Sequence, residues 1–504
     1  MTKTLYDHFA AHAPESPALI WEGETISYGE LGRMVDIAYA EIEKADLPAG
    51  LPIGLRARKS PEAIALVLAC LRAERPFLLP SVELAPETLA RLFAQGGASR
   101  VLEPHGPRSE SASLRAIQEP QVAADEPSHW PPAEGAEEVS FMLTTSGSTG
   151  LPKIVPLPVG AVDRFTDWAA EQFEIGPGTV VANYAPLNFD LCLLDIWTTL
   201  KHGGCVALVD QDRATQADYL ADLVTANEVN VLQAVPMLYR LLIDVSREAG
   251  RTFPSVKHVI TTGDKIPATS LEALPELFPN SDFYNIYGCT ETNDSLIHKF
   301  QGLAEGDVPT QVPVGQPLPG VRTLIKTEDD SFLEGSGTGE LLVSTPFQTR
   351  GYLNAELNID RFVPQADSET GETIWYRTGD IVRRHDDGTL TLEGRADFYV
   401  KVRGVRVSTQ VVEQAIQEHP EVVEVAVIAV EDELAGKRLH AVVRREEGST
   451  LNSLGLRKHC ASRLARTEMP STIEIGTDPL PKTSTGKVDR KRVLAQLEEA
   501  HVNG

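Results

Sequence analysis

The order of apolar and polar positions predicts alternating strands and helices along most of the chain. Apolar, strand-like runs at 16–21 and 24–28 flank a Glu-Gly turn, and a helical pattern follows at 29–42. The same alternation returns at 52–55, 61–73, 180–184, 217–227, 229–235, 256–264 and 282–288. Strands that alternate with helices build a mostly parallel sheet covered by helices. The predicted fold class is therefore α/β.

The pattern changes near residue 337, where strands at 337–344 and 388–394 indicate a small β subdomain. Beyond it come a helix at 411–418, strands at 422–430 and 439–444, and a helix at 453–464. We therefore expect a large α/β domain of several subdomains, residues 1–396, and a small α+β domain, residues 397–504. Residues 104–138 are rich in Pro, Ser, Glu and Ala and are predicted to be a surface connection.

Composition and charge narrow the class of protein. A chain of 504 residues with 42% apolar and 23% charged residues is typical of a soluble protein with more than one domain. Five scattered cysteines without a CxxC pair argue against a zinc or disulfide framework and fit a reducing compartment, so we expect a cytoplasmic protein. The sequence has no signal-peptide pattern and no apolar run long enough to span a bilayer. A net charge of −26 opposes nonspecific nucleic-acid binding, and neither a nucleic-acid nor a membrane partner is expected.

A run of hydroxyls and glycines at 143–153 follows a strand-like segment and ends in Lys153. Glycines let backbone N–H groups approach an anion closely, and consecutive N–H groups form a concave anion site. This composition predicts a phosphate-binding loop, although the Gly-x-x-x-x-Gly-Lys-Ser/Thr pattern of P-loops is absent. An ordinary flexible loop has the same composition and remains the alternative.

Three further stretches carry candidate chemistry. Tyr287 and Glu291 follow a strand, where an aromatic ring can stack on a purine and a carboxylate can hold Mg²⁺; a capped helix start is the alternative. Asp380 follows a glycine and can accept from two ribose hydroxyls, or it simply completes a β-turn. Lys487 lies in a basic loop and can stabilise charge on a phosphoryl oxygen, whereas most such loops are only solvated.

These motifs occur together and in one order, and from about Leu5 to Leu494 the chain resembles the adenylate-forming superfamily. This superfamily comprises acyl-CoA synthetases, luciferases and nonribosomal-peptide adenylation domains. The chain is most similar to free-standing amino-acid adenylation domains and, in size and in segment 165–168, to D-alanine–carrier-protein ligases. Residues 188–197 resemble the motif whose Asp, here Asp190, binds the substrate α-ammonium, because a buried carboxylate needs a cation. A structural Asp at a helix start is the alternative.

The resemblance implies ATP- and Mg²⁺-dependent formation of an aminoacyl-adenylate, followed by transfer to the phosphopantetheine thiol of a carrier protein. Asp397 would be the hinge of a mobile small domain, and Gly404 would lie in the channel for the pantetheine arm. The catalytic residues would be Lys487, Thr290 and Glu291, with Glu291 also holding the metal. The ATP-binding residues would be Thr145, Ser146, Gly147, Ser148, Thr149, Gly150, Lys153, Asp264, Asn285, Tyr287, Asp380 and Arg395. The substrate pocket would be formed by Asp190, Leu191, Leu194, Gln233, Ile260, Thr262, Ile286, Asp294 and Ser295.

This pocket wall has no aromatic residue, and Gln233 is long enough to shorten the pocket. A small amino acid such as glycine, alanine, serine or proline is therefore expected, and a β-amino acid stays open. Asp294 favours a hydroxyl or amino group on the substrate if it points inward, and says nothing if it points to solvent. Three positions depart from the family pattern: Ile154 replaces a common Gly, Asp264 replaces a common Glu, and residues 408–410 are not acidic.

Two other functions compete with this interpretation. An acyl-CoA synthetase would activate a fatty or aryl acid, but Asp190 would repel such a substrate's carboxylate unless a cation were present. A noncatalytic nucleotide-binding homologue is the other rival, and the presence of both Lys153 and Lys487 counts against it. Because the chain ends at Gly504, soon after Lys487, the carrier protein is expected to be separate.

Overall fold

The computed structural model describes residues 4–104, 112–116, 128–129, 138–145, 151–300, 312–367, 371–402, 405–432, 436–461, 463–464, 468–482 and 488–502. The chain forms two compact units. Unit 1 comprises Met1–Leu324, Leu342–Arg377 and Arg384–Thr391, and unit 2 comprises Ile325–Leu341, Thr378–Arg383 and Leu392–Gly504. A large, mixed α/β N-terminal part and a small C-terminal part confirm the predicted fold class. The division expected at Asp397 stays a prediction.

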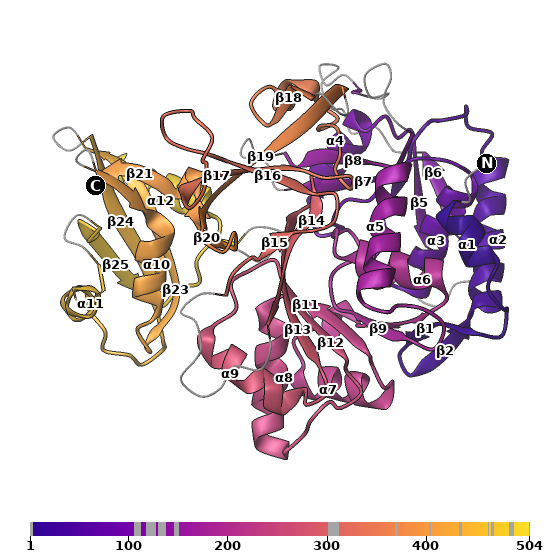
Figure 1. Cartoon of the computed structure of the whole chain (residues 1–504), viewed down its shortest axis with the longest axis horizontal. Coiled ribbons are helices and arrows are strands. Elements are labelled where there is room, and N and C mark those ends of the chain that lie inside the picture. Colours follow the sequence, from indigo (N-terminus) through magenta and orange to yellow (C-terminus); the bar gives the residue numbers. More distant parts are fainter. Residues whose placement is uncertain are drawn as a thin grey trace. The chain divides into compact units, whose positions relative to one another are not determined.

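Unit 1 contains a nine-stranded sheet in the order β15-β14-β13-β12-β11-β9-β10-β1-β2 (Figure 1). The pairs from β13 through β12, β11, β9 and β10 to β1 are parallel, and the strands at both edges pair antiparallel. Helices α7 (Ala217–Ala226), α8 (Pro236–Ala249) and α9 (Ala268–Leu277) bury their apolar sides against one face. The strands are β1 (Pro17–Trp21), β2 (Glu24–Ser27), β9 (Val180–Asn183), β10 (Cys205–Leu208), β11 (Val231–Ala234), β12 (His258–Thr262), β13 (Asp282–Cys289), β14 (Asn293–Phe300) and β15 (Gln316–Pro317).

A second sheet of unit 1 has six strands in the order β6-β5-β3-β4-β7-β8. Strands β5, β3, β4 and β7 pair in parallel, and β6 and β8 are antiparallel edges. Strand β6 lies inside the stretch predicted to be a connection, so that prediction is wrong for residues 112–116. The composition of these residues does not reveal the strand, because its formation depends on pairing with β5. The strands are β3 (Ile53–Leu55), β4 (Phe77–Leu78), β5 (Arg100–Pro104), β6 (Ala112–Ala116), β7 (Val139–Thr145) and β8 (Lys153–Pro158). The helices of this region are α1 (Leu5–Ala10), α2 (Tyr28–Lys44), α3 (Pro61–Arg72) and α4 (Pro86–Gln95).

A third sheet has the order β16-β17-β19-β18, and β20 pairs with β19. Its strands are β16 (Arg322–Lys326), β17 (Gly337–Ser344), β18 (Phe362–Asp367), β19 (Gly371–Arg384) and β20 (Leu390–Arg395). The predicted strand at 337–344 is confirmed. Short 3₁₀ helices, η2 (Gln211–Arg213), η3 (Ala355–Asn358) and η4 (Ala396–Phe398), lie in connections.

The C-terminal part of unit 2 is a small sheet, β23-β24-β25, covered on both faces. Val425 and Val427 pack with α10 and α11, whereas Ala426 and Ile428 pack with α12, because successive strand residues point to opposite faces. The predicted helices and strands beyond residue 410 are thereby confirmed, except that the helix expected at 453–464 ends at Cys460. The elements are β21 (Tyr399–Val402), β22 (Val405–Ser408), α10 (Thr409–Gln417), β23 (Val422–Asp432), β24 (Gly436–Arg445), α11 (Ser453–Cys460), β25 (Thr472–Gly476) and α12 (Arg490–Val502).

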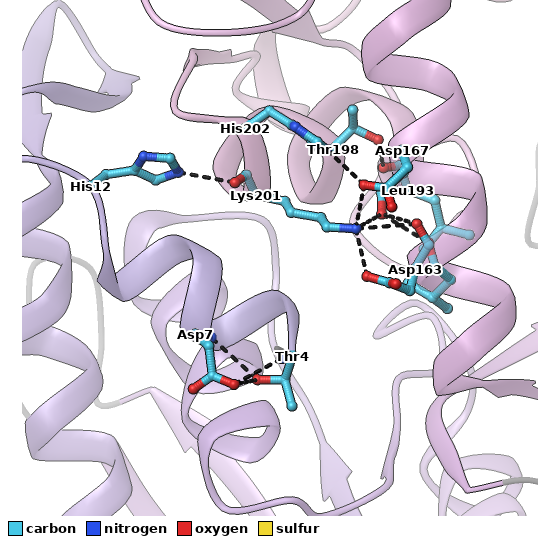
Figure 2. Close-up of polar contacts among 11 residues, drawn as sticks. Thr4, Asp7, His12, Asp163, Asp167, Leu193, Thr198, Lys201 and His202 are labelled. Carbon is cyan, nitrogen blue, oxygen red and sulfur yellow. Dashed lines mark hydrogen bonds and ion pairs between the residues drawn. The ribbon is translucent and has the colours of Figure 1, made fainter. Parts of the chain in front are cut away.

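A buried lysine joins two helical segments of unit 1 (Figure 2). Lys201 of α6 (Thr199–His202) extends to α5 (Val159–Gln172), where its Nζ lies 2.5 Å from Asp163 Oδ1 and 2.6 Å from Asp167 Oδ1. The two carboxylates are one helical turn apart and share a face. The ring of His12 contacts the Lys201 carbonyl at 3.0 Å. Because a buried cation without such partners is costly, this cluster holds α6, and the π-helix η1 (Leu193–Thr198) directly before it, against α5. Among the described residues, no helix combines the length and apolar character needed to cross a bilayer.

Candidate active site

Four predicted pocket residues lie on one face of the nine-stranded sheet. Gln233 of β11 pairs with Ile260 of β12, and Thr262 of β12 pairs with Ile286 of β13. Partners in a parallel register point to the same side, and residues two apart on a strand share a face. All four side chains are buried. The sheet thus gathers residues that the sequence separates, near the carboxyl ends of parallel strands, where open α/β sheets bind ligands.

A buried carboxylate that sequence reasoning missed contacts this face. Asp195 of η1 accepts hydrogen bonds from Asn183 Nδ2 at 3.0 Å and from Gln233 Nε2 at 2.8 Å. Gln233 Nε2 also donates to the Leu191 carbonyl at 3.1 Å, so the Gln233 amide fixes the backbone beside Asp190's loop. Burial raises the pKa of Asp195 to about 7, and the two amides oppose that rise. Leu194, another predicted wall residue, is buried in η1. The sequence signal for Asp195 was a lone acid inside the apolar run 193–197.

The backbone that leads to Asp190 is fixed by a second buried residue that no pattern revealed. Lys59 Nζ donates to the carbonyls of Asn183 at 2.9 Å, Tyr184 at 3.2 Å and Ala185 at 2.9 Å. These three acceptors match the three donors of an ammonium group. Burial lowers the pKa of Lys59 to about 8, and the acidic groups nearby oppose that shift. The contact ties the end of β9 to the start of α3.

Asp190 lies just before η1 and is held by two donors. Its Oδ1 accepts from the Leu191 amide at 3.0 Å, and the Thr290 side chain hydrogen-bonds the same carboxylate. Burial raises the pKa of Asp190; the Thr290 bond opposes that rise, and the Glu291 carboxylate adds to it. Within the described part of the chain, this carboxylate has no cationic partner. A desolvated carboxylate in this state gains most from an incoming cation.

Asp294 is the second carboxylate near Asp190. It is half-buried and lies opposite Gly288 in the β13–β14 pair. Burial raises its pKa to about 8, and the charges of Asp190 and Asp195 add to the rise. No described residue donates a hydrogen bond to it or forms an ion pair with it. Because the charge of Asp190 contributes to the raised pKa of Asp294, the two carboxylates lie within electrostatic range of each other.

Thr290 and Glu291 occupy the turn between β13 and β14. The chain passes directly into β14, so the alternative of a capped helix start is wrong; Asn293 takes up the left-handed backbone, with φ 58°, that closes the turn. Ser295 Oγ lies 3.1 Å from both the Asn293 carbonyl oxygen and Thr292 Oγ1, two acceptors between which its one proton is shared. These bonds occupy the Ser295 hydroxyl, which was predicted to line the pocket.

Glu291 is buried at this turn and is held by a phenol. Tyr352 Oη donates to Glu291 Oε1 at 2.6 Å. The Nζ of Lys153 is 3.4 Å from the same Oη and 4.5 Å from the centre of the Tyr352 ring. The hydroxyl of Tyr376 is 3.3 Å from that of Tyr352. Burial raises the pKa of Tyr352, so its phenol stays a neutral donor. The structure thereby joins the predicted metal ligand to the predicted phosphate lysine.

Only the two ends of the predicted phosphate loop are described. Thr145 at the end of β7 pairs with Lys153 at the start of β8 in an antiparallel arrangement. Thr145 Oγ1 is buried and has no hydrogen-bond partner among the described residues, as expected for a group that meets a polar ligand. Ser146, Gly147, Ser148, Thr149 and Gly150 lie outside the described residues.

The residues predicted to bind adenine lie on or beside β12 and β13. Asn285 Nδ2 donates to the Pro313 carbonyl at 2.8 Å. Strand alternation puts Asn285 and Tyr287 on the face opposite Ile286, so the adenine residues and the pocket wall are not on one face of β13. Asp264 follows β12 in an exposed turn and accepts from the amide of the next residue.

Unit 2 brings together the predicted ribose residues. Arg395 Nη1 lies 3.0 Å from Asp380 Oδ1, and the Asp380 amide donates to Thr378 Oγ1 at 3.0 Å. Asp397 lies in η4. Gly404 and Lys487 are outside the described residues. Among the residues that are described, no group of three or more His, Cys, Asp or Glu side chains is arranged to hold a metal ion.

Comparison with known proteins identifies the family of the chain. A family model described as "AMP-binding enzyme" matches residues 6–353, and one described as "AMP-binding enzyme C-terminal domain" matches residues 411–487. An L-proline–[L-prolyl-carrier protein] ligase of Pseudomonas fluorescens is 29% identical over 97% of this chain and 98% of its own length. A D-alanine–D-alanyl carrier protein ligase of Bacillus licheniformis is 25% identical over 97% of this chain and 98% of its own. Phenyloxazoline synthase MbtB of Mycobacterium tuberculosis is 30% identical over 98% of this chain, which corresponds to 35% of that protein.

A solved structure supports the fold. The o-succinylbenzoate CoA synthetase of Bacillus subtilis, in complex with its acyl-adenylate, superposes with a TM-score of 0.80 at 21% identity over 98% of both chains. The predicted resemblance to adenylate-forming enzymes is therefore confirmed. Since the first family model covers well over half of the chain and the second follows it in the small C-terminal part, the protein belongs to the AMP-binding enzyme family of adenylate-forming ligases.

Proposed function

We propose that this protein activates a small amino acid with ATP and transfers the aminoacyl group to the phosphopantetheine thiol of a separate carrier protein. The observation that carries the proposal is Asp190, a desolvated carboxylate held by Leu191 and Thr290 and lacking a cation among the described residues. A substrate ammonium supplies that missing charge, whereas a simple fatty or aryl acid does not. The carboxylate end of the same substrate would then point away from Asp190, because like charges repel.

The nucleotide would be bound by groups from several elements. Thr145 Oγ1 is a buried donor that no described residue engages, and Lys153, its partner across the β7–β8 pair, supplies a positive charge, which suits a triphosphate. Tyr287 and Asn285 are the proposed adenine contacts. Asp264, in the turn after β12, is proposed to line the adenine pocket with them. In unit 2, Asp380 is proposed to accept from the ribose hydroxyls, oriented by Arg395.

Glu291 fits a magnesium ion as one ligand. A carboxylate oxygen is the hard donor that Mg²⁺ prefers, and Mg²⁺ commonly takes one or two protein carboxylates together with substrate phosphates and water. The Tyr352 bond engages Oε1 and leaves Oε2 without a described donor. When bound, the ion would supply charge neutralisation on the phosphate oxygens.

In the first proposed step, a carboxylate oxygen of the amino acid attacks the α-phosphorus of ATP. The bond to the bridging oxygen of the β-phosphate breaks, and pyrophosphate leaves with that electron pair. In the second step, the sulfur of the carrier thiol attacks the acyl carbon and the thiol proton is released to solvent; the bond between the acyl carbon and the phosphate oxygen breaks, and AMP leaves with that electron pair. The protein's own contribution is alignment and electrostatic stabilisation: Asp190 holds one end of the substrate, and Lys487 and Thr290 are proposed to stabilise charge near the α-phosphate.

The relatives support the carrier protein as acceptor. The proline and D-alanine ligases match over nearly their whole length, and their names specify a carrier protein. We therefore expect ATP–pyrophosphate exchange to be supported by small amino acids, and a labelled amino acid to appear on a holo-carrier protein. The apo-carrier, which lacks the phosphopantetheine thiol, is the control. Exchange that prefers an aryl or fatty acid, or release of the product as acyl-CoA without loading of any carrier, would favour an acyl-CoA synthetase instead.

Asp294 refines the substrate class. Because its pKa of about 8 keeps it mostly protonated at neutral pH, it can hydrogen-bond a hydroxyl or amino group on the substrate side chain without an added charge. We expect Asp294→Leu to lower kcat/KM for serine relative to alanine by about 3- to 10-fold, the worth of one hydrogen bond. If the variant leaves kcat/KM for serine and for 2,3-diaminopropionate, each relative to alanine, unchanged, Asp294 does not contact the substrate.

The same residue predicts a pH dependence of stability. Its folded pKa of about 8 lies above the ordinary value of 3.8, so the native state binds the extra proton between these limits. The contribution of Asp294 to the free energy of unfolding is therefore most favourable below pH 3.8, declines as the pH rises toward 8, and levels off above pH 8. The unfolding temperature of Asp294→Asn should exceed that of the wild type by a margin that grows between pH 5 and pH 8. A constant margin would contradict the assignment.

A further inference from the structure

Residues 349–353, the bridging segment, connect the Glu291 turn to strand β8. The Thr349 amide donates to the Glu291 carbonyl at 3.0 Å, and Thr349 Oγ1 donates to the Pro156 carbonyl at 2.6 Å. The Leu353 amide donates to the Ile154 carbonyl at 3.0 Å. Pro156 and Ile154 belong to β8, the strand that leaves the predicted phosphate loop. Two parts of the site that are far apart in the sequence are therefore joined through one short segment.

Tyr352 is the residue of this segment whose side chain reaches both parts. Its phenol donates to Glu291 Oε1 at 2.6 Å and lies 3.4 Å from Lys153 Nζ. The residue is itself fixed, because its amide donates to Asn358 Oδ1 at 2.7 Å, Asn358 Nδ2 donates to its carbonyl at 3.1 Å, and its ring packs edge-on against Phe362. A buried donor held this firmly restricts the carboxylate it contacts to one orientation.

We propose that Tyr352 is a positioning residue for magnesium-bound ATP. It fixes one oxygen of Glu291, leaves the other oxygen available to the metal ion, and sets the distance between Glu291 and the ammonium group of Lys153. This inference rests on the proposed function, from which the roles of Glu291 and Lys153 come. Partners that orient a metal ligand typically change metal affinity 10- to 100-fold when they are removed.

The test is Tyr352→Phe, which removes the hydroxyl and keeps the ring that packs on Phe362 and lies under Lys153. Binding of the β,γ-methylene analogue of ATP is measured by calorimetry with excess Mg²⁺ and again with a chelator. We expect the variant to bind the magnesium complex about 10-fold more weakly than the wild type and the metal-free analogue about equally well. The midpoint of the Mg²⁺ dependence should rise by the same factor.

Tyr376→Phe is the matched control. It removes another buried phenol, which contacts the Tyr352 hydroxyl at 3.3 Å and has no described hydrogen bond to Glu291 or Lys153. It should change the binding of the magnesium complex less than twofold. Wild-type binding by Tyr352→Phe, or equal losses with and without Mg²⁺, would overturn the inference. Because these titrations contain no amino acid, their outcome is independent of whether the wild type shows amino-acid-dependent exchange, which tests the proposed function.

Discussion

Lys487→Ala should lower amino-acid-dependent ATP–pyrophosphate exchange at least about 100-fold while the unfolding temperature stays that of the wild type. The proposed ammonium group stabilises charge that grows on the α-phosphate oxygens, and one preorganised contact of this kind in a site without water is worth about 3 kcal/mol or more. Lys487 lies outside the described residues, but it is the last position matched by the C-terminal family model. Exchange is measured with saturating ATP and amino acid, so that the loss reports on the chemical step.

Lys482 provides the matched control, because it belongs to the same basic stretch of sequence. Its Nζ lies 2.5 Å from Glu424 Oε1, so it already has a partner within unit 2. Lys482→Ala should therefore keep exchange within a fewfold of the wild type. Exchange by Lys487→Ala near the wild-type rate, or equal losses in both variants, would exclude a specific role for Lys487.

Asp190→Asn should raise the KM for the amino acid and lower kcat/KM about 100-fold, while the affinity for ATP is unchanged. Loss of a buried charge pair costs about 3–5 kcal/mol, and the lower end applies here because Asp190 retains some exposure. Asparagine keeps the size of the side chain and an oxygen for the Leu191 amide, so the turn before η1 is preserved. The ratio of kcat/KM values at saturating ATP gives the loss directly.

The decisive comparison changes the substrate as well as the enzyme. Propionate has the carboxylate of alanine but no ammonium group, so its weak activity should be insensitive to Asp190→Asn or should rise. The interaction between the two changes then isolates the charge pair, as in a double-mutant cycle. Equal losses with alanine and propionate would show that Asp190 acts on the fold of the site and not on the ammonium group.

Much of the fold is visible in the sequence because short apolar strands and amphipathic helices alternate clearly. Strand β17 coincides with the predicted run, and the parallel core of the nine-stranded sheet follows from the rhythm of strands and helices. Strand β6 was missed because its short segment forms an edge whose identity depends on β5. The hairpin at Glu291 was undecided because a Thr-Glu-Thr sequence caps a helix as readily as it forms a turn.

The candidate site was partly predictable because part of it lies on successive strands of the predicted sheet. Residues on successive strands, such as Gln233, Ile260 and Ile286, converge once the sheet order is known. The side chains that hold the site together were not predictable, since Lys59 and Tyr352 reach their partners through tertiary contacts that leave no periodic trace. Asp195 lies between these cases, because an acid within an apolar run signals burial but not its amide partners.

The path of the chain between the two compact units bears on where a hybrid of this chain and a relative should be joined. The polypeptide passes from one unit to the other at residues 324/325, 341/342, 377/378, 383/384 and 391/392. A single crossover at Asp397 would bring in the C-terminal stretch of a relative and retain the parental Ile325–Leu341 and Thr378–Arg383. The small unit of the resulting hybrid would combine residues from both parents. The Asp380–Arg395 ion pair would remain parental, because both residues precede the crossover, and the residues after it would come from the relative. A hybrid that takes these two segments from the relative as well, with the crossover moved to Leu392, would have a small unit from one parent only.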